Sequence, residues 1–160
     1  MYAQIFAREI EVQLEDENGP FLYPNQYVDF DGTSEAVEKA AELAAGLADE
    51  AAIAKRLYRF VADHTDYDYE KAETVQKGYL PDPDETLASG KGICFDYSAL
   101  LATMLRAQGI PAQMVIGVVM PEGISHAWNR ALLGGEWVFM DATFDGDSHR
   151  EEDYTQERVY

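Results

Sequence analysis

The sequence has little cysteine and little positive charge. Its 160 residues contain one cysteine, Cys94, so no disulfide can form within the chain, and a zinc site built on several cysteines is excluded as well. Lysine and arginine total 12 against 30 acidic residues, which gives a formal net charge of −18. General nucleic-acid binders need a basic surface that displaces phosphate counterions, so this composition argues against a nucleic acid as partner.

Long hydrophobic runs are missing too. No stretch of about 18 apolar residues occurs, so no membrane-spanning segment is expected. The start of the chain, MYAQIFAREIEVQLEDENG, lacks the basic segment and continuous apolar core of a secretory signal peptide. A secreted protein whose signal had been removed would look the same, so the sequence leaves the compartment open, and the oligomeric state as well.

What the chain does contain is enough apolar material for a folded core. Hydrophobic residues make up 47% of it and aromatic residues 12%, unlike a disordered acidic tail. The length predicts one domain over residues 1–160. Residues 91–145 hold 5 acidic and 3 basic residues, a net charge of −2, whereas residues 1–90 hold 20 and 7, a net charge of −13. The weakly charged block is therefore expected to form the centre of the fold.

Hydrophobic periodicity and turn residues divide the chain into segments. Ile10, Val12 and Leu14 alternate with polar residues as in a half-buried strand, and the aromatic stretch after Pro20 is expected to give a second strand. Two helices follow, with apolar stripes through Val37, Ala41, Ala44 and Leu47 and through Ile53, Leu57, Phe60 and Val61. The predicted segments are a β-rich extension (1–32), helices (33–63), a loop with one short helical turn (64–93), a core segment (94–145) and an acidic tail (146–160).

The core segment 94–145 has the clearest pattern, and it also holds the residues that point to a catalytic function. Residues 94–108 are apolar almost all round and are followed by Gly109, which predicts a buried helix with a glycine at its end. Strands are predicted over 113–120, 126–133 and 136–144, the last two joined by a tight Gly134-Gly135 turn. Helices followed by an antiparallel sheet indicate an α+β fold in which the helices pack on the sheet.

Cys94 begins the buried helix, directly after Gly90-Lys91-Gly92. Unpaired N–H groups at a helix N-terminus favour an anionic sulfur, and they can also hold the oxyanion that a thiolate creates when it attacks a carbonyl. In a two-residue hairpin, Asp141 faces Trp128, and His126 is then a diagonal neighbour on the same face of the sheet. A single buried cysteine is more often an inert thiol, but the three residues in this order predict a Cys94–His126–Asp141 unit.

The strings GKGICFDYSALLATMLRAQGIPA and HAWNRALLGGEWVFMDATF strongly resemble the transglutaminase-like superfamily of cysteine enzymes. The match covers residues 85–144 closely and, more weakly, residues 49–69, where RLYRFVADHTDYDY is similar to a family helix and the aromatic segment after it. The resemblance implies a papain-like α+β core. It also implies that Cys94 is the nucleophile, that His126 is the base and acid, and that Asp141 orients His126.

The second oxyanion donor is not fixed by these motifs. Family enzymes pair the N–H of the nucleophile with a side chain from an upstream segment, which makes Gln76 and Tyr79 candidates, while Tyr67 or Tyr69 could instead line the cleft. No metal is expected, because His64 and His149 have no ligand partners at metal spacing, and the segment DATFDGDSHREED lacks the spacing of an EF-hand loop. No cofactor is expected either.

These residues predict acyl transfer on amide bonds of a protein or peptide through a thioester at Cys94. Hydrolysis, as in a protease or amidase, is favoured because a small lone domain shows no added subsite to exclude water. The alternatives are a protein-glutamine transglutaminase with an amine acceptor and a non-catalytic binding module that retains the fold. Acyl transfer from coenzyme A fits less well, since the chain is strongly acidic.

Overall fold

The computed structural model describes residues 16–145 and 150–160 of the chain. The strand predicted from Ile10, Val12 and Leu14 lies outside the described residues. The longer helices are α1 (Glu35–Ala44), α2 (Glu50–His64) and α5 (Cys94–Ala107). The main sheet consists of β3 (Ala112–Val119), β4 (Ile124–Leu133), β5 (Glu136–Met140) and β6 (Tyr154–Val159), in the order β5-β4-β3-β6. The shorter elements are 3₁₀ helices at Gly19–Leu22 and Glu151–Asp153, β1 (Asp66–Tyr67), α3 (Tyr69–Thr74), α4 (Pro83–Ser89) and β2 (Lys91–Gly92).

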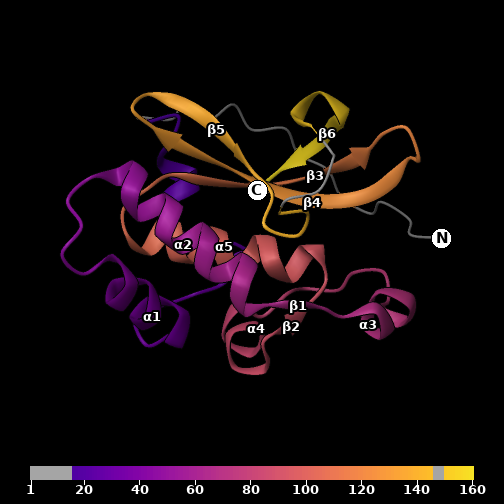
Figure 1. The fold of residues 1–160 in the computed structure, drawn as a ribbon, viewed down its shortest axis with the longest axis horizontal. Helices are drawn as coiled ribbons and strands as arrows, with labels where there is room; N and C mark the ends of the chain where they lie inside the picture. Colours follow the sequence, from indigo (N-terminus) through magenta and orange to yellow (C-terminus); the bar gives the residue numbers. More distant parts are fainter. Residues whose placement is uncertain (1–15, 146–149) are drawn as a thin grey trace, which may run out of the picture.

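Helix α5 lies at the centre, between the sheet and the other helices (Figure 1). It contacts β3 and β4 on one side and α1, α2 and α4 on the other. All of its residues are buried except Phe95 and Ala107, as its apolar sequence predicts. Its end is secured by Arg106, whose guanidinium donates to the main-chain oxygens of Tyr23, Ala112 and Tyr160. The α+β fold with helices on an antiparallel sheet is confirmed.

The two predicted helices of residues 33–63 are present, but the buried stripe of α1 shares only Ala44 with the predicted one. Ala36, Ala40 and Ala44 face the core, whereas Ala41 is exposed. The two stripes lie side by side on the helix, and alanine differs little from its neighbours in hydrophobicity, so periodicity alone could not choose between them. The small side chains allow α1 to pack closely against α5.

The β-rich extension is wrong for the described residues 16–32. The aromatic stretch begins with a 3₁₀ helix at Gly19–Leu22, with Pro20 in its first turn, and no strand follows in this segment. Asn25 accepts hydrogen bonds from the N–H groups of Tyr27 and Val28, a local turn that competes with strand pairing. The segment 64–93 also differs from the predicted loop, because it contains α3, α4 and the two-residue parallel pair of β1 and β2.

The hairpin register is as predicted. Leu133 pairs with Glu136 and Asn129 with Met140, so the two-residue turn lies at Gly134-Gly135. Strand β5 ends at Met140, four residues before the predicted end at 144, and Asp141 follows directly.

The segment predicted as an acidic tail instead contributes β6, which pairs antiparallel with β3 at the edge of the sheet. A Cβ atom on Gly117 would lie 2.0 Å from the Thr155 oxygen, so the close approach of the two strands requires glycine at this position.

Candidate active site

The loop before α5 presents Cys94 at the first turn of the helix. Strand β2 pairs with β1, with Tyr67 opposite Gly92, and the N–H of Asp68 donates to the Gly92 oxygen at 2.9 Å. Gly90 has a φ of 62°, a left-handed conformation that ends α4 and turns the chain toward β2. The side chain of Cys94 is buried, with an exposed fraction of 8%. The sulfur therefore lies where the N–H groups of α5 are concentrated.

The hairpin of β4 and β5 brings His126 close to Asp141, which directly follows β5. His126 Nε2 and Asp141 Oδ2 are 2.7 Å apart, and both residues are buried. The Asp141 carboxylate is itself held in place, because its Oδ1 accepts the N–H of Thr143 at 3.0 Å and its Oδ2 accepts the hydroxyl of Tyr154 at 2.7 Å. Phe144 stacks on the His126 ring with centroids 4.4 Å apart. These contacts fix both the position and the plane of the imidazole.

Cys94 completes this group of buried ionisable side chains. Burial acts to lower the pKa of His126, but hydrogen bonds with Asp141 and with Cys94, together with their charges, raise it to about 9. Because Nε2 is engaged by Asp141, Nδ1 is the nitrogen that remains for the sulfur. A raised pKa favours the imidazolium at neutral pH, and this cation stabilises a thiolate beside it. The structure thus brings the predicted residues Cys94, His126 and Asp141 together.

The two candidates for the second oxyanion donor are engaged elsewhere. Gln76 is exposed and donates to the main-chain oxygen of Thr74. The Tyr79 hydroxyl donates to Asp96 at 2.6 Å. Tyr67 is partly buried and pairs with Gly92, two residues before Cys94. Burial raises its pKa, and the next contribution to that rise comes from Cys94.

Comparison with known proteins shows the family of this chain. Residues 37–142, about two thirds of the chain, match the model of the transglutaminase-like superfamily. The chain belongs to the transglutaminase-like superfamily. It is 34% identical over 84 residues to an uncharacterized protein of Mycobacterium leprae and 29% identical over 90 residues to a UPF0252 protein of Methanocaldococcus jannaschii. These matches cover 42% and 52% of this chain but only 30% and 26% of the two relatives, so the chain spans less than a third of either.

Solved structures share the superfamily fold. A candidate cysteine protease from Cytophaga hutchinsonii matches with a TM-score of 0.74 and 19% identity, over 92% of this chain and 48% of the other. The periplasmic domain of TgpA from Pseudomonas aeruginosa matches with a TM-score of 0.58 and 24% identity, over 79% and 46%. LapG from Legionella pneumophila, treated with EGTA, matches with a TM-score of 0.56 and 14% identity, over 79% and 82%. At such identities these likenesses concern the fold alone.

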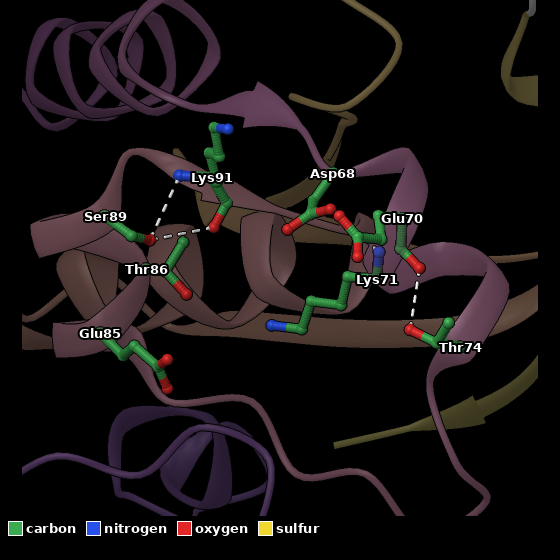
Figure 2. Close-up of a pocket in the computed structure, with 8 residues that line it drawn as sticks. All are labelled: Asp68, Glu70, Lys71, Thr74, Glu85, Thr86, Ser89 and Lys91. Atoms are coloured by element: carbon green, nitrogen blue, oxygen red, sulfur yellow. Dashed lines mark hydrogen bonds between the residues drawn. The ribbon is translucent and has the colours of Figure 1, made fainter.

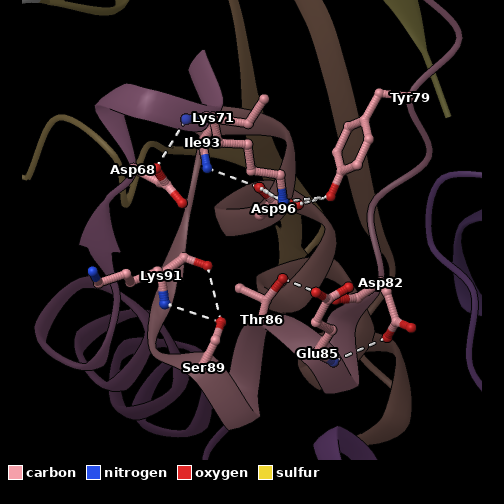
Figure 3. Close-up of polar contacts among 10 residues, drawn as sticks. All are labelled: Asp68, Lys71, Tyr79, Asp82, Glu85, Thr86, Ser89, Lys91, Ile93 and Asp96. Carbon is pink, nitrogen blue, oxygen red and sulfur yellow. Dashed lines mark hydrogen bonds and ion pairs between the residues drawn. The ribbon is translucent and has the colours of Figure 1, made fainter. Parts of the chain in front are cut away.

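A buried carboxylate, Asp96, binds the loop that precedes Cys94. Asp96 is fully buried, and its oxygens accept the N–H of Ile93 at 2.8 Å, the hydroxyl of Tyr79 at 2.6 Å and the ammonium of Lys71 at 2.9 Å (Figure 3). Burial, followed by the bond to Asp96, raises the pKa of Tyr79 to about 12. A Cβ atom on Gly92 would lie 2.5 Å from that of Asp96, so the carboxylate can reach the loop only past a glycine.

Lys71 reaches Asp96 from the wall of a cavity of about 380 Å³ between α3 and α4. Glu70 and Thr74 of α3 line one side of this cavity, and Glu85 and Ser89 of α4 line the other (Figure 2). Among the described residues, no three His, Cys, Asp or Glu side chains are placed to hold a metal ion. The described part of the chain also has no helix that combines the length and apolar character needed to cross a membrane.

Sequence reasoning missed Tyr154, Asp96 and Lys71. Tyr154 stands in a charged segment without a motif, and it reaches Asp141 only because β6 joins the sheet beside β3. Asp96 carried a weak signal, since an acidic residue in the first turn of a helix often caps its N-terminus. Lys71 carried none, because its contact with Asp96 depends on how α3 folds back onto α5.

Proposed function

We propose that this protein catalyses acyl transfer on amide bonds of a protein or peptide, with water as the usual acceptor. In this proposal Cys94 is the nucleophile, His126 the base and acid, and Asp141 the residue that orients His126. The observation that carries the proposal is the position of buried His126, whose Nε2 is 2.7 Å from Asp141 Oδ2 while Cys94 contributes to its raised pKa.

The proposed reaction has two stages. The Cys94 thiolate attacks the amide carbonyl, a carbon–sulfur bond forms, and the carbonyl oxygen becomes an oxyanion. When the carbon–nitrogen bond breaks, the His126 imidazolium gives its proton to the leaving amine. Water then adds to the thioester, neutral His126 takes the proton of that water, and the acid is released as the thiolate–imidazolium pair re-forms.

The first-turn N–H groups of α5 are suited to hold the oxyanion, and one such donor is typically worth about 3–4 kcal/mol. For the second donor we favour the Tyr67 hydroxyl over Gln76 and Tyr79. Cys94 contributes to the raised pKa of Tyr67. The Tyr79 hydroxyl instead donates to Asp96, and the Gln76 amide donates to the main-chain oxygen of Thr74. The Tyr67→Phe variant should lower kcat while leaving KM nearly unchanged, because the bond forms only in the transition state.

Alkylation by iodoacetamide tests the proposed nucleophile. At about pH 6 only a stabilised thiolate reacts quickly, so Cys94 should label at least about tenfold faster than it does in a His126→Ala variant. His64→Ala is the matched control, because it also removes one histidine but from an exposed site on α2. Slow labelling that does not respond to His126→Ala would favour the non-catalytic binding module.

The acyl acceptor is tested separately, with a glutamine-containing protein and a labelled primary amine as substrates. Hydrolysis predicts released ammonia or cleaved peptide with little amine incorporated. Efficient incorporation would establish the transglutaminase alternative instead, and the residues in the proposed mechanism would keep their roles.

A further inference from the structure

A second cavity, of about 240 Å³, adjoins the first turn of α5. Ile93 and Phe95, the residues on either side of Cys94, both line it, and Ile116 of β3 lines it from the sheet. Tyr27 contributes another apolar wall, with its ring centroid 6.4 Å from that of Phe95. This space is therefore mainly apolar and is built on the same turn of chain that holds the proposed nucleophile.

Two lining side chains of this cavity carry charge, and both are cations. Lys77 follows α3, and Arg158 lies on β6, where it pairs in register with Ile116. Burial raises the pKa of Tyr27, and the charge of Arg158 opposes that rise, so the guanidinium acts on the wall of the cavity. Within residues 16–145 and 150–160, neither Lys77 nor Arg158 takes part in an ion pair.

Two neighbouring cations that form no ion pair among the described residues are unexpected in a chain with 30 acidic residues and 12 basic ones. Beside an apolar floor they form a surface complementary to an apolar group next to a carboxylate. The volume is below the range of about 300–1,000 Å³ that is usual for drug-sized ligands, so it suits one side chain and part of its neighbour.

We propose that this cavity is a substrate subsite for an apolar residue followed or preceded by an acidic one, close to the amide bond that reacts. The role of this cavity as a substrate subsite rests on the proposed function of Cys94. Binding of a peptide in the cavity does not depend on that function. The acidic surface as a whole favours cationic ligands, whereas this subsite favours an anionic group.

Binding can be measured without catalysis, by titrating the full chain with capped dipeptides and following the methyl NMR signals of Val75, Ile93 and Ile116. The probes are N-acetyl-Leu-Glu-amide, N-acetyl-Leu-Gln-amide and N-acetyl-Leu-Lys-amide. The Glu probe should bind about fivefold more tightly than the isosteric Gln probe, since each exposed charge pair contributes up to about 1 kcal/mol, and the Lys probe should bind most weakly.

A double variant, Lys77→Gln with Arg158→Gln, should abolish the difference between the Glu and Gln probes. The matched control is Lys55→Gln with Arg56→Gln, which removes the same charge from exposed positions on α2 and should keep the wild-type preference. Equal binding of all three probes, or no shift of the three methyl signals at about 10 mM probe, would overturn the proposal.

A peptide digest of known sequences then tests the link to catalysis. Peptides that react should be enriched in an apolar–acidic pair on one side of the reacting amide, and the enrichment should disappear in the Lys77→Gln, Arg158→Gln variant. Reaction without this preference would remove the substrate assignment and leave the proposed function standing. If Cys94 is alkylated slowly in both the wild type and His126→Ala while the Glu probe still binds, the proposed enzymatic function would be wrong and the binding site would stand.

Discussion

At the scale of residues, Asp141 binds two side chains through a single carboxylate oxygen, so the position of one partner depends on the other. Its Oδ2 accepts from Tyr154 and contacts His126 Nε2, each at 2.7 Å. Tyr154 also lies beside the imidazole, with ring centroids 5.9 Å apart, and its hydroxyl acts on His126 through the carboxylate, which makes it a positioning residue.

Removing the Tyr154 hydroxyl tests this role. A hydrogen bond to a charged group contributes about 1.5–3 kcal/mol, so Tyr154→Phe should lower kcat/KM by about tenfold or more through kcat, because the imidazole is less well oriented. The rate of amide turnover measures the effect, with Tyr23→Phe, at an exposed tyrosine, as the control. Unchanged kcat in Tyr154→Phe would show that the N–H groups of Thr143 and Phe144 suffice to hold Asp141.

The raised pKa of His126 also predicts how stability depends on pH. The folded-state pKa of about 9 lies above the ordinary value of 6.5, so protonation favours the folded state. This contribution is complete below about pH 6.5 and is lost as the pH rises through about 9, with a magnitude of up to about 3 kcal/mol. Urea unfolding across that range should show a fall in the free energy of unfolding that is reduced in His126→Gln. An equal fall in both proteins would contradict the prediction.

At the scale of elements, the Asp96 contacts join three parts of the chain. Lys71 comes from α3, Tyr79 from the segment after it, and Ile93 from the loop that leads into α5. A carboxylate without exposure to water is stable only while its partners remain, so these short elements keep their places through Asp96 rather than through a large apolar contact.

A double-mutant cycle on Asp96 and Lys71 measures this coupling. Asp96→Ala should lower the free energy of unfolding by about 3 kcal/mol, because it leaves Lys71 without its carboxylate and leaves the Tyr79 hydroxyl and the Ile93 N–H without their acceptor. Lys71→Met should lower it by a similar amount, because it leaves the buried carboxylate without its cation. The double variant should lose clearly less than the sum of the two, which urea unfolding can determine. Additive losses would mean that the two side chains do not stabilise the loop together.

At the scale of the whole molecule, the sequence predicted the parts whose signals are local. The apolar helix 94–108 became α5, and the Gly134-Gly135 turn set the register in which Asn129 pairs with Met140, directly before Asp141. The contacts of Tyr154 and Tyr67 were not predictable in this way. Each depends on pairing between segments far apart in sequence, namely β3 with β6 and β1 with β2, and charged or two-residue strands carry almost no periodicity.

The net charge of −18 acts on the whole molecule as well. Ion pairs between exposed groups, such as Lys39 with Glu42 and Arg150 with Glu152, offset little of the repulsion, because each is worth at most about 1 kcal/mol. Repulsion among the remaining carboxylates is stronger in the compact state than in the unfolded one, and salt screens it over about 10 Å at 0.1 M. Raising NaCl from about 0.01 to about 0.3 M should therefore raise Tm, as measured by circular dichroism, and sodium and potassium chloride should do so equally. A fall in Tm would mean that attractive ion pairs outweigh the repulsion, even in so acidic a chain.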